Sequence, residues 1–185
     1  MAHARILDAS RAALLVVDVQ EAFRTVIPVF DRLALRVSIA VRAFRVLDLP
    51  VFITEQYPKG LGRTAKEIVD VLPADFRYIE KTSFSSCGAE ELESGFKTAA
   101  STQLVVCGLE THVCVNQTVH DLLDRGFDVH LLTDCVASRS EHDKQAGLSK
   151  MLASGVVASG VEMALFEIMH DSTHSRFKEI QALIK

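Results

Sequence analysis

The chain has 185 residues, of which 49% are apolar, and its 24 acidic and 20 basic residues give a net charge of −4. This length accommodates one domain with a substantial core, so we expect residues 1–185 to form a single domain without disordered linkers. The basic residues are scattered and form no stripe that could neutralise phosphates, so no nucleic-acid partner is expected.

The apolar runs are too short to cross a bilayer, which takes about 20 residues, so no membrane partner is expected. The first run leads into Asp18 without a small-residue cleavage site, which argues against a signal peptide. The four cysteines lack paired Cys-x-x-Cys spacing. A reducing cytoplasm suits such thiols best, and mitochondrial targeting is left open.

Six short apolar runs, rich in β-branched residues, are typical of strands buried on both faces of a parallel sheet. In chain order they are residues 13–17, 50–54, 77–79, 103–107, 128–132 and 155–158. Segments with helical spacing separate them, as in βαβ units. The sequence therefore predicts an α/β fold, a three-layer α/β/α domain with a six-stranded, mainly parallel, Rossmann-like sheet.

Helical spacing is clear over residues 31–47, where Leu33, Val37 and Phe44 share one face. A second helix over residues 112–125 stops at Gly126, the residue type favoured just past a helix end. The other predicted helices are residues 90–98, 141–151, 161–169 and 175–184. Residues 55–73 are rich in turn formers and predict a loop at the functional edge of the sheet.

Three reactive residues fall at one edge of this sheet. Ligands of open parallel sheets bind beyond the carboxyl ends of the strands, where the strand order reverses. Asp18 follows the first predicted strand, Lys81 follows the third, and Cys114 begins the helix after the fourth. Unpaired N–H groups in the first turn of a helix stabilise an anion, so we expect Cys114 to ionise readily. A nucleophile, a carboxylate and a cation together predict covalent catalysis.

Each of the three also has an ordinary structural explanation, as a buried thiol, a turn former or a solvated lysine. Among the other cysteines, Cys107 is expected in the core. Cys87 and Cys135 rank below Cys114, although Cys135 is predicted just past a strand at the same edge. No Gly-x-Ser-x-Gly elbow supports a serine nucleophile, and the seven histidines show no metal-ligand spacing.

Three ordered segments resemble the isochorismatase-like cysteine hydrolases: residues 15–20 (LVVDVQ), 80–85 (EKTSFS) and 107–115 (CGLETHVCV). Residues 54–62, 138–140 and 177–180 make the resemblance closest to the isochorismatase domain-containing proteins. It implies a catalytic triad of Asp18, Lys81 and Cys114. It also implies a cis peptide between Leu109 and Glu110, with the backbone N–H groups of Glu110 and Cys114 aimed at an oxyanion.

Two departures from the superfamily narrow the implied activity. Metal-dependent nicotinamidases carry Asp-x-His after the second strand, whereas this chain has Glu55-Gln56-Tyr57, so no metal or other cofactor is expected. True isochorismatases lack the cysteine, so Cys114 favours an amide-like C–N bond as the target. Asp18 would take the thiol proton while the sulfur forms a thioester. A non-enzymatic interaction protein and a redox-active thiol protein remain the alternatives.

The substrate pocket should be formed by the loops that carry the triad. Its candidates, each with a packing alternative, are Phe23, Gln56, Tyr57, Phe84, Thr111 and His112. A mostly apolar pocket suits a small molecule, such as an aromatic one. The resemblance also implies a homo-oligomer, a dimer or larger, and Phe166, Ile168 and Ile180 are predicted to offer apolar surface for it.

Overall fold

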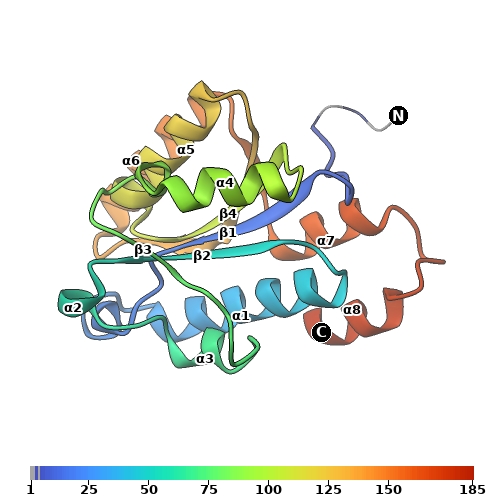
Figure 1. Ribbon diagram of the computed structural model, residues 1–185, viewed down its shortest axis with the longest axis horizontal. Coiled ribbons are helices and arrows are strands. Elements are labelled where there is room, and N and C mark those ends of the chain that lie inside the picture. Colours follow the sequence, from blue (N-terminus) through green and yellow to red (C-terminus); the bar gives the residue numbers. More distant parts are fainter. Residues whose placement is uncertain (1–2, 4) are drawn as a thin grey trace.

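The computed structural model describes residue 3 and residues 5–185, which form three layers (Figure 1). A sheet of parallel strands is the middle layer, in the order β3-β2-β1-β4-β5-β6. The strands are β1 (Ala12–Val17), β2 (Val51–Gln56), β3 (Ile79–Lys81), β4 (Gln103–Leu109), β5 (Asp128–Ala137) and β6 (Val157–Ser159). The predicted fold class is confirmed.

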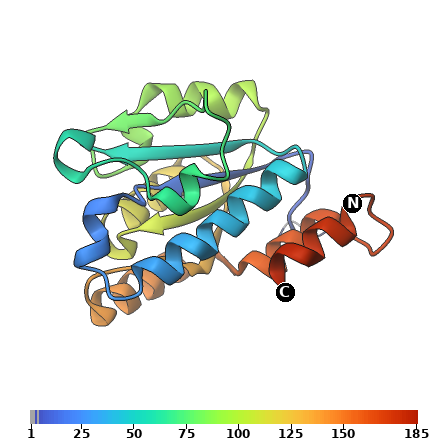
Figure 2. The ribbon, with the colours of Figure 1, turned by 90° about the horizontal axis from the view of Figure 1, so that it is seen from below.

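Helices cover both faces of the sheet (Figure 1). One face carries α1 (Phe30–Val46), α3 (Lys66–Val69), α7 (Val161–Met169) and α8 (Phe177–Ile184), and the other carries α4 (Glu90–Thr98), α5 (Asn116–Asp124) and α6 (Glu141–Ala153). Figure 2 shows α1 running beneath the strands with α7 and α8 beside it. The short α2 (Pro58–Leu61) follows the end of β2.

Two apolar clusters fill the spaces between the layers. In β1, Leu14 and Val16 belong to the cluster on the α1 side, whereas Leu15 and Val17 belong to the cluster on the α4 and α5 side. Every residue of β1 is buried. This two-sided burial is the reason that the strands appear in the sequence as continuous apolar runs and not as alternating ones.

Two strand boundaries differ from the prediction and change the surroundings of reactive residues. β3 includes Lys81, which pairs with Gln56 of β2, so Lys81 ends the strand and does not follow it. β5 continues to Ala137, and its register against β4 shifts between Val106 and Gly108. The prediction for Cys135 is therefore wrong, because this residue lies inside β5 and is fully buried.

Other boundaries shift without moving a candidate residue. β6 covers Val157–Ser159, and not residues 155–158. Residues 55–73, predicted as a loop, hold the end of β2 and the short helices α2 and α3. The helix predicted at residues 112–125 is divided into a π-helical turn, Thr111–Val115, and α5. It stops as predicted at Gly126, whose φ is +81°.

The apolar surface predicted for an oligomer is smaller than expected. Ile168 and Ile180 are buried in the cluster on the α1 side, so that part of the prediction is wrong. Phe166 is exposed. In the described part of the chain, no helix combines the length and the apolar composition that a membrane crossing requires.

His130 is expected to make the stability of the fold dependent on pH. It is fully buried in β5, and neither ring nitrogen has a hydrogen-bond partner among the described residues. Burial lowers the pKa of His130, and the charges of Glu167 and Asp128 oppose this only in part. A histidine whose pKa is lower in the folded state contributes stability at pH values above its unfolded-state pKa of about 6.5. This contribution is lost as the pH falls from there through the folded-state pKa.

We therefore expect the free energy of unfolding to decrease between about pH 7 and pH 5, and His130→Phe to reduce that decrease. Urea unfolding at both pH values measures this. His142→Gln, on the exposed side of α6, is the matched control and should keep the native pH dependence. An unchanged slope in His130→Phe would contradict the prediction.

Candidate active site

Asp18 follows β1 in a left-handed conformation, with φ +51°. Its Oδ1 accepts a hydrogen bond from Thr54 Oγ1 at 2.7 Å, and its Oδ2 lies 2.6 Å from Lys81 Nζ. The side chains of Asp18 and Lys81 are each 1% exposed. The sheet therefore brings together a buried carboxylate and a buried ammonium from the ends of β1 and β3.

The Lys81 ammonium is surrounded by oxygen atoms. Besides Asp18, it donates to Gln56 Oε1 at 2.9 Å and to the backbone oxygens of Ser83 and Phe84 at 3.1 and 2.9 Å. An ammonium has three N–H donors, so these four acceptors occupy all of them. Lys81 is thus held in one place and has no free donor for another group.

Cys114 lies in the π-helical turn after β4 and is 7% exposed, and its thiol is close enough to Asp18 for the carboxylate to shift its pKa. The prediction that it ionises readily is wrong. Burial and the negative charge of Asp18 raise the pKa of Cys114 to about 12, and Lys81 offsets only part of this effect. The resting thiol is therefore protonated and needs a base.

Asp18 is placed to act as that base. Burial raises the pKa of the Asp18 carboxyl, and the charge and hydrogen bond of Lys81, followed by the hydrogen bonds of Thr54 and Cys114, oppose the rise. A carboxylate with a raised pKa holds a proton better than an exposed one. A carboxylate beside the thiol can therefore accept the proton of the sulfur.

The turn between β4 and Cys114 has the predicted cis peptide at Leu109–Glu110. The Glu110 side chain is nearly buried, and its Oε2 accepts hydrogen bonds from the backbone N–H and the Nε of Arg139 at 2.9 and 3.1 Å. The Glu110 carbonyl accepts from the N–H groups of Val113 and Val115. Contacts from Arg139, just after β5, and from the π-helical turn therefore hold the segment that presents Cys114.

Three of the six predicted pocket residues lie beside the trio or its turn. Gln56 contacts Lys81, as described above. Thr111 is fully buried, and its Oγ1 has no hydrogen-bond partner among the described residues. His112 Nδ1 lies 3.0 Å from Ser138 Oγ. Thr111 and His112 are therefore part of the turn that carries Cys114, and Gln56 lies beside Lys81.

The other three candidates are in different surroundings. Tyr57 and Phe84 are 54% and 55% exposed. Phe23 packs against the core cluster on the α1 side. A cavity of about 480 Å³ lies next to Lys81 and is lined by residues that include Tyr57 and Ser83. Of these three aromatic residues, only Tyr57 lines that cavity.

Thr54 and Ser86, which were not predicted as site residues, complete the polar surroundings of Asp18. Ser86 Oγ lies 3.3 Å from Thr54 Oγ1, and both residues are fully buried. Thr54 pairs with Val17 across β1 and β2, one residue before Asp18. The signal available for Thr54 was a threonine at the end of the apolar run 50–54.

No group of three His, Cys, Asp or Glu residues in the described part of the chain is arranged to hold a metal ion. The side chains around Asp18 are an ammonium, a hydroxyl and a thiol. All three can donate a hydrogen bond to the carboxylate, so the arrangement is suited to proton transfer.

Comparisons with known proteins identify relatives along most of the chain. The family model of the isochorismatase domain matches residues 12–163. Isochorismatase domain-containing protein 2 of Danio rerio is 38% identical over 179 residues, which cover 96% of this chain and 89% of the relative. A solved structure described as MAR1 ribonuclease from Caenorhabditis elegans has a TM-score of 0.91 and 35% identity, covering 97% of this chain and 92% of that one.

A more distant structure shares the fold alone. YcaC of Escherichia coli, described as an octameric hydrolase of unknown specificity, has a TM-score of 0.84 and 21% identity. The alignment covers 100% of this chain and 96% of YcaC.

Proposed function

Since this chain belongs to the isochorismatase family, we propose that it is a cysteine hydrolase that cleaves a small amide-like C–N bond. The observation that carries the proposal is the double contact of Asp18. Its carboxylate meets the Lys81 ammonium at 2.6 Å and also lies beside the Cys114 thiol, whose pKa its charge raises. A nucleophile, its base and a fixed cation are the parts that covalent hydrolysis needs.

In the proposed first step, the Cys114 sulfur attacks the substrate carbonyl carbon while Asp18 takes the thiol proton. A C–S bond forms, and the carbonyl oxygen becomes an oxyanion. The backbone N–H groups of Glu110 and Cys114 would donate to it, each such donor contributing about 3 kcal/mol to transition-state stabilisation. Lys81 stays charged and offsets the negative charge of Asp18 whenever the carboxylate is ionised.

In the following steps, Asp18 passes its proton to the leaving nitrogen as the C–N bond breaks, and a thioester remains. Water then attacks the thioester, with Asp18 accepting a proton from it. The acid product leaves, and the proton returns to the Cys114 sulfur. Proton transfer by a positioned carboxylate commonly contributes about 10²–10⁴-fold to the rate.

We propose a small-molecule substrate that contacts Gln56, Thr111 and His112. The unpartnered hydroxyl of Thr111 supports this, because a buried polar group gains free energy when a ligand supplies its missing hydrogen bond. The high exposure of Tyr57 and Phe84 suits residues at a pocket entrance. Catalysis is proposed to need no cofactor.

Two further proposals concern partners. The Caenorhabditis elegans relative is described as a ribonuclease, but the net charge of −4 and the scattered basic residues of this chain disfavour binding along a phosphate backbone. We propose no nucleic-acid partner. A homo-oligomer is supported by the octamer described for YcaC and by the exposed Phe166.

Iodoacetamide labelling of Cys114 at different pH values, measured by mass spectrometry, tests the coupled trio without a known substrate. Asp18→Asn removes the negative charge that raises the thiol pKa, so its labelling profile should move to lower pH by about one unit or more. Adding Lys81→Met should move it back up, because a cation that stabilises the thiolate is lost. Cys87, whose raised pKa has no contribution from Asp18, is the internal control. Identical Cys114 profiles in all three proteins would contradict the proposal.

A further inference from the structure

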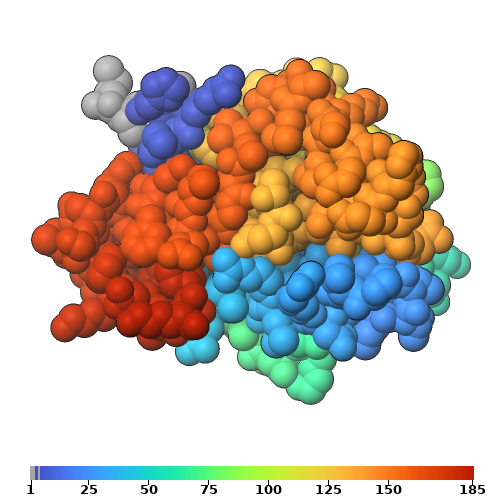
Figure 3. Space-filling view, turned by 180° about the vertical axis from the view of Figure 1, so that it is seen from behind, coloured from blue at the N-terminus to red at the C-terminus, as the bar shows by residue number. Residues whose placement is uncertain are grey.

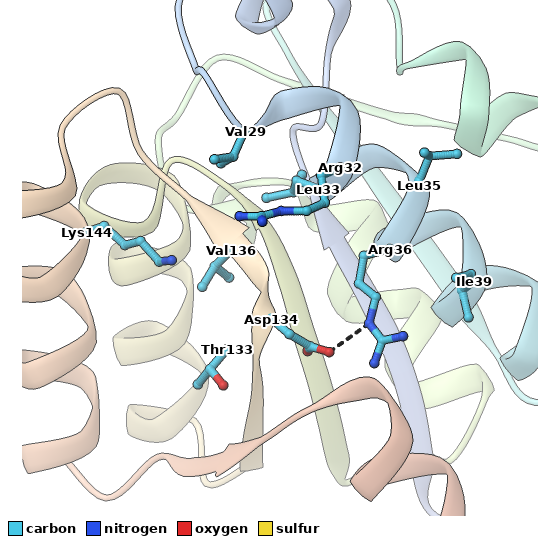
Figure 4. A pocket seen from close by; sticks show the side chains of 10 residues that line it. All are labelled: Val29, Arg32, Leu33, Leu35, Arg36, Ile39, Thr133, Asp134, Val136 and Lys144. Carbon is cyan, nitrogen blue, oxygen red and sulfur yellow. Dashed lines mark hydrogen bonds and ion pairs between the residues drawn. The ribbon is translucent and has the colours of Figure 1, made fainter. Parts of the chain in front are cut away.

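A second cavity lies between α1, β5 and α6 and shares no lining residue with the trio (Figure 4). Its volume is about 560 Å³, and small-molecule sites span about 300–1,000 Å³. Figure 3 shows β5 reaching the surface between α1 and α6. Within the described chain, β6 pairs with β5 only from His130 to Leu132, so the later part of β5 has no strand beside it on this side. We call this cavity the α1–α6 groove.

The α1–α6 groove carries an excess of positive charge. Arg32 and Arg36 of α1 and Lys144 of α6 line it, together with one carboxylate, Asp134. Arg36 Nε lies 2.8 Å from Asp134 Oδ2. The same carboxylate accepts the N–H of Val161 at the start of α7. Asp134 is therefore already committed to other partners.

Arg32 and Lys144 are left without a counter-ion. In the described chain, neither forms an ion pair, and Figure 4 shows them extending toward each other from opposite walls, with Val136 between them. Two cations that converge in a hollow repel each other, and an anion between them would relieve that repulsion. This local excess stands out in a chain with a net charge of −4.

Apolar side chains adjoin the two cations. Val29 just before α1, Leu33 of α1 and Val136 of β5 line the groove. Val29 is 37% exposed, which leaves apolar surface for a ligand. We infer that the α1–α6 groove binds a small organic carboxylate, with its charged head between Arg32 and Lys144 and a hydrocarbon or aryl body against these apolar residues. Bidentate donation from Arg32 suits a carboxylate head.

Calorimetric titration of the native protein with phenylbutyrate tests this inference, with phenylbutanol as the neutral analogue. Native protein should bind phenylbutyrate and not phenylbutanol. Arg32→Gln combined with Lys144→Gln should raise the Kd by about tenfold or more, because both charge-assisted contacts are lost. Lys150→Gln, on the exposed side of α6, should retain native affinity. Cys114→Ala should also retain it, which would show that phenylbutyrate does not bind at the trio.

Three results would overturn the inference. The first is no binding by the native protein at millimolar phenylbutyrate. The second is equal affinity in the double variant. The third is that phenylbutanol binds as tightly as phenylbutyrate, which would show that the groove recognises the apolar body and not the carboxylate. Arg32 is exposed and Lys144 is half-buried, so the variants should fold, and a circular dichroism melt checks this.

Discussion

Replacing Cys114 with alanine is expected to lower turnover of any small amide that the protein hydrolyses by about 10⁴-fold or more, because the thioester cannot form without the sulfur. Ammonia release from a panel of small amides identifies a substrate with the native protein and then measures the variant. Cys87→Ala is the matched control. Cys87 is also a buried cysteine, and it lies in a short turn before α4, so this change should leave turnover within a few-fold of native.

The same assay tests whether Asp18 and Cys114 act as one unit. Groups that act together show non-additive losses. We therefore expect Asp18→Asn to cost nearly as much as Cys114→Ala, and the double variant to cost no more than the worse single variant. Full turnover by Cys114→Ala would exclude the thioester mechanism. Release of nucleotides from RNA, lost in Cys114→Ala, would instead favour the activity described for the Caenorhabditis elegans relative.

Replacing Gly108 with alanine is expected to lower the free energy of unfolding by more than about 4 kcal/mol, or to prevent folding. Gly108 has a φ of +124° in β4, and an added Cβ would lie 2.0 Å from the carbonyl oxygen of Val17 in β1. That oxygen belongs to the backbone of a fully buried central strand. The clash can be relieved only by separating β1 from β4, which would also move Asp18 away from Cys114.

Gly126→Ala is the control for the effect of a positive φ without a clash. Gly126 has a φ of +81°, and nothing lies within 4 Å of the position of an added Cβ. Its cost should be about 1 kcal/mol, the usual penalty of a left-handed alanine. Urea unfolding of both variants measures the difference. A Gly108→Ala protein as stable as Gly126→Ala would show that the strands separate easily.

The fold could be predicted because its strands are buried on both sides, so that their apolar runs stand out in the sequence. The rule for parallel sheets then placed Asp18 and the segment before Cys114 at the same edge of the sheet. The structure adds that their strands are neighbours, since Val17 pairs with Gly108. The limits of β5 could not be predicted in this way. Thr133 and Asp134 look like the end of a strand, but Asp134 points outward to Arg36 and to α7.

The electrostatic surroundings of Cys114 could not be predicted from its place on a helix. The helix start alone favours a thiolate, whereas burial and the neighbouring Asp18 have the larger effect and keep the proton on sulfur. This balance depends on the depth of the site and on a contact between residues 96 positions apart. Thr54 and Ser86 were missed for a similar reason, because their role follows from packing around Asp18.

A protonated thiol is also a poor target for peroxide, because the thiolate is the form that is oxidised. Asp18, the carboxylate proposed to take the thiol proton during an attack, therefore keeps the sulfur protonated and unreactive between turnovers. Cys87, Cys107 and Cys135 are buried free thiols as well, so no exposed resolving cysteine is at hand to recycle a sulfenic acid. The arrangement would protect the proposed nucleophile against oxidation, which is the opposite of what a redox sensor requires.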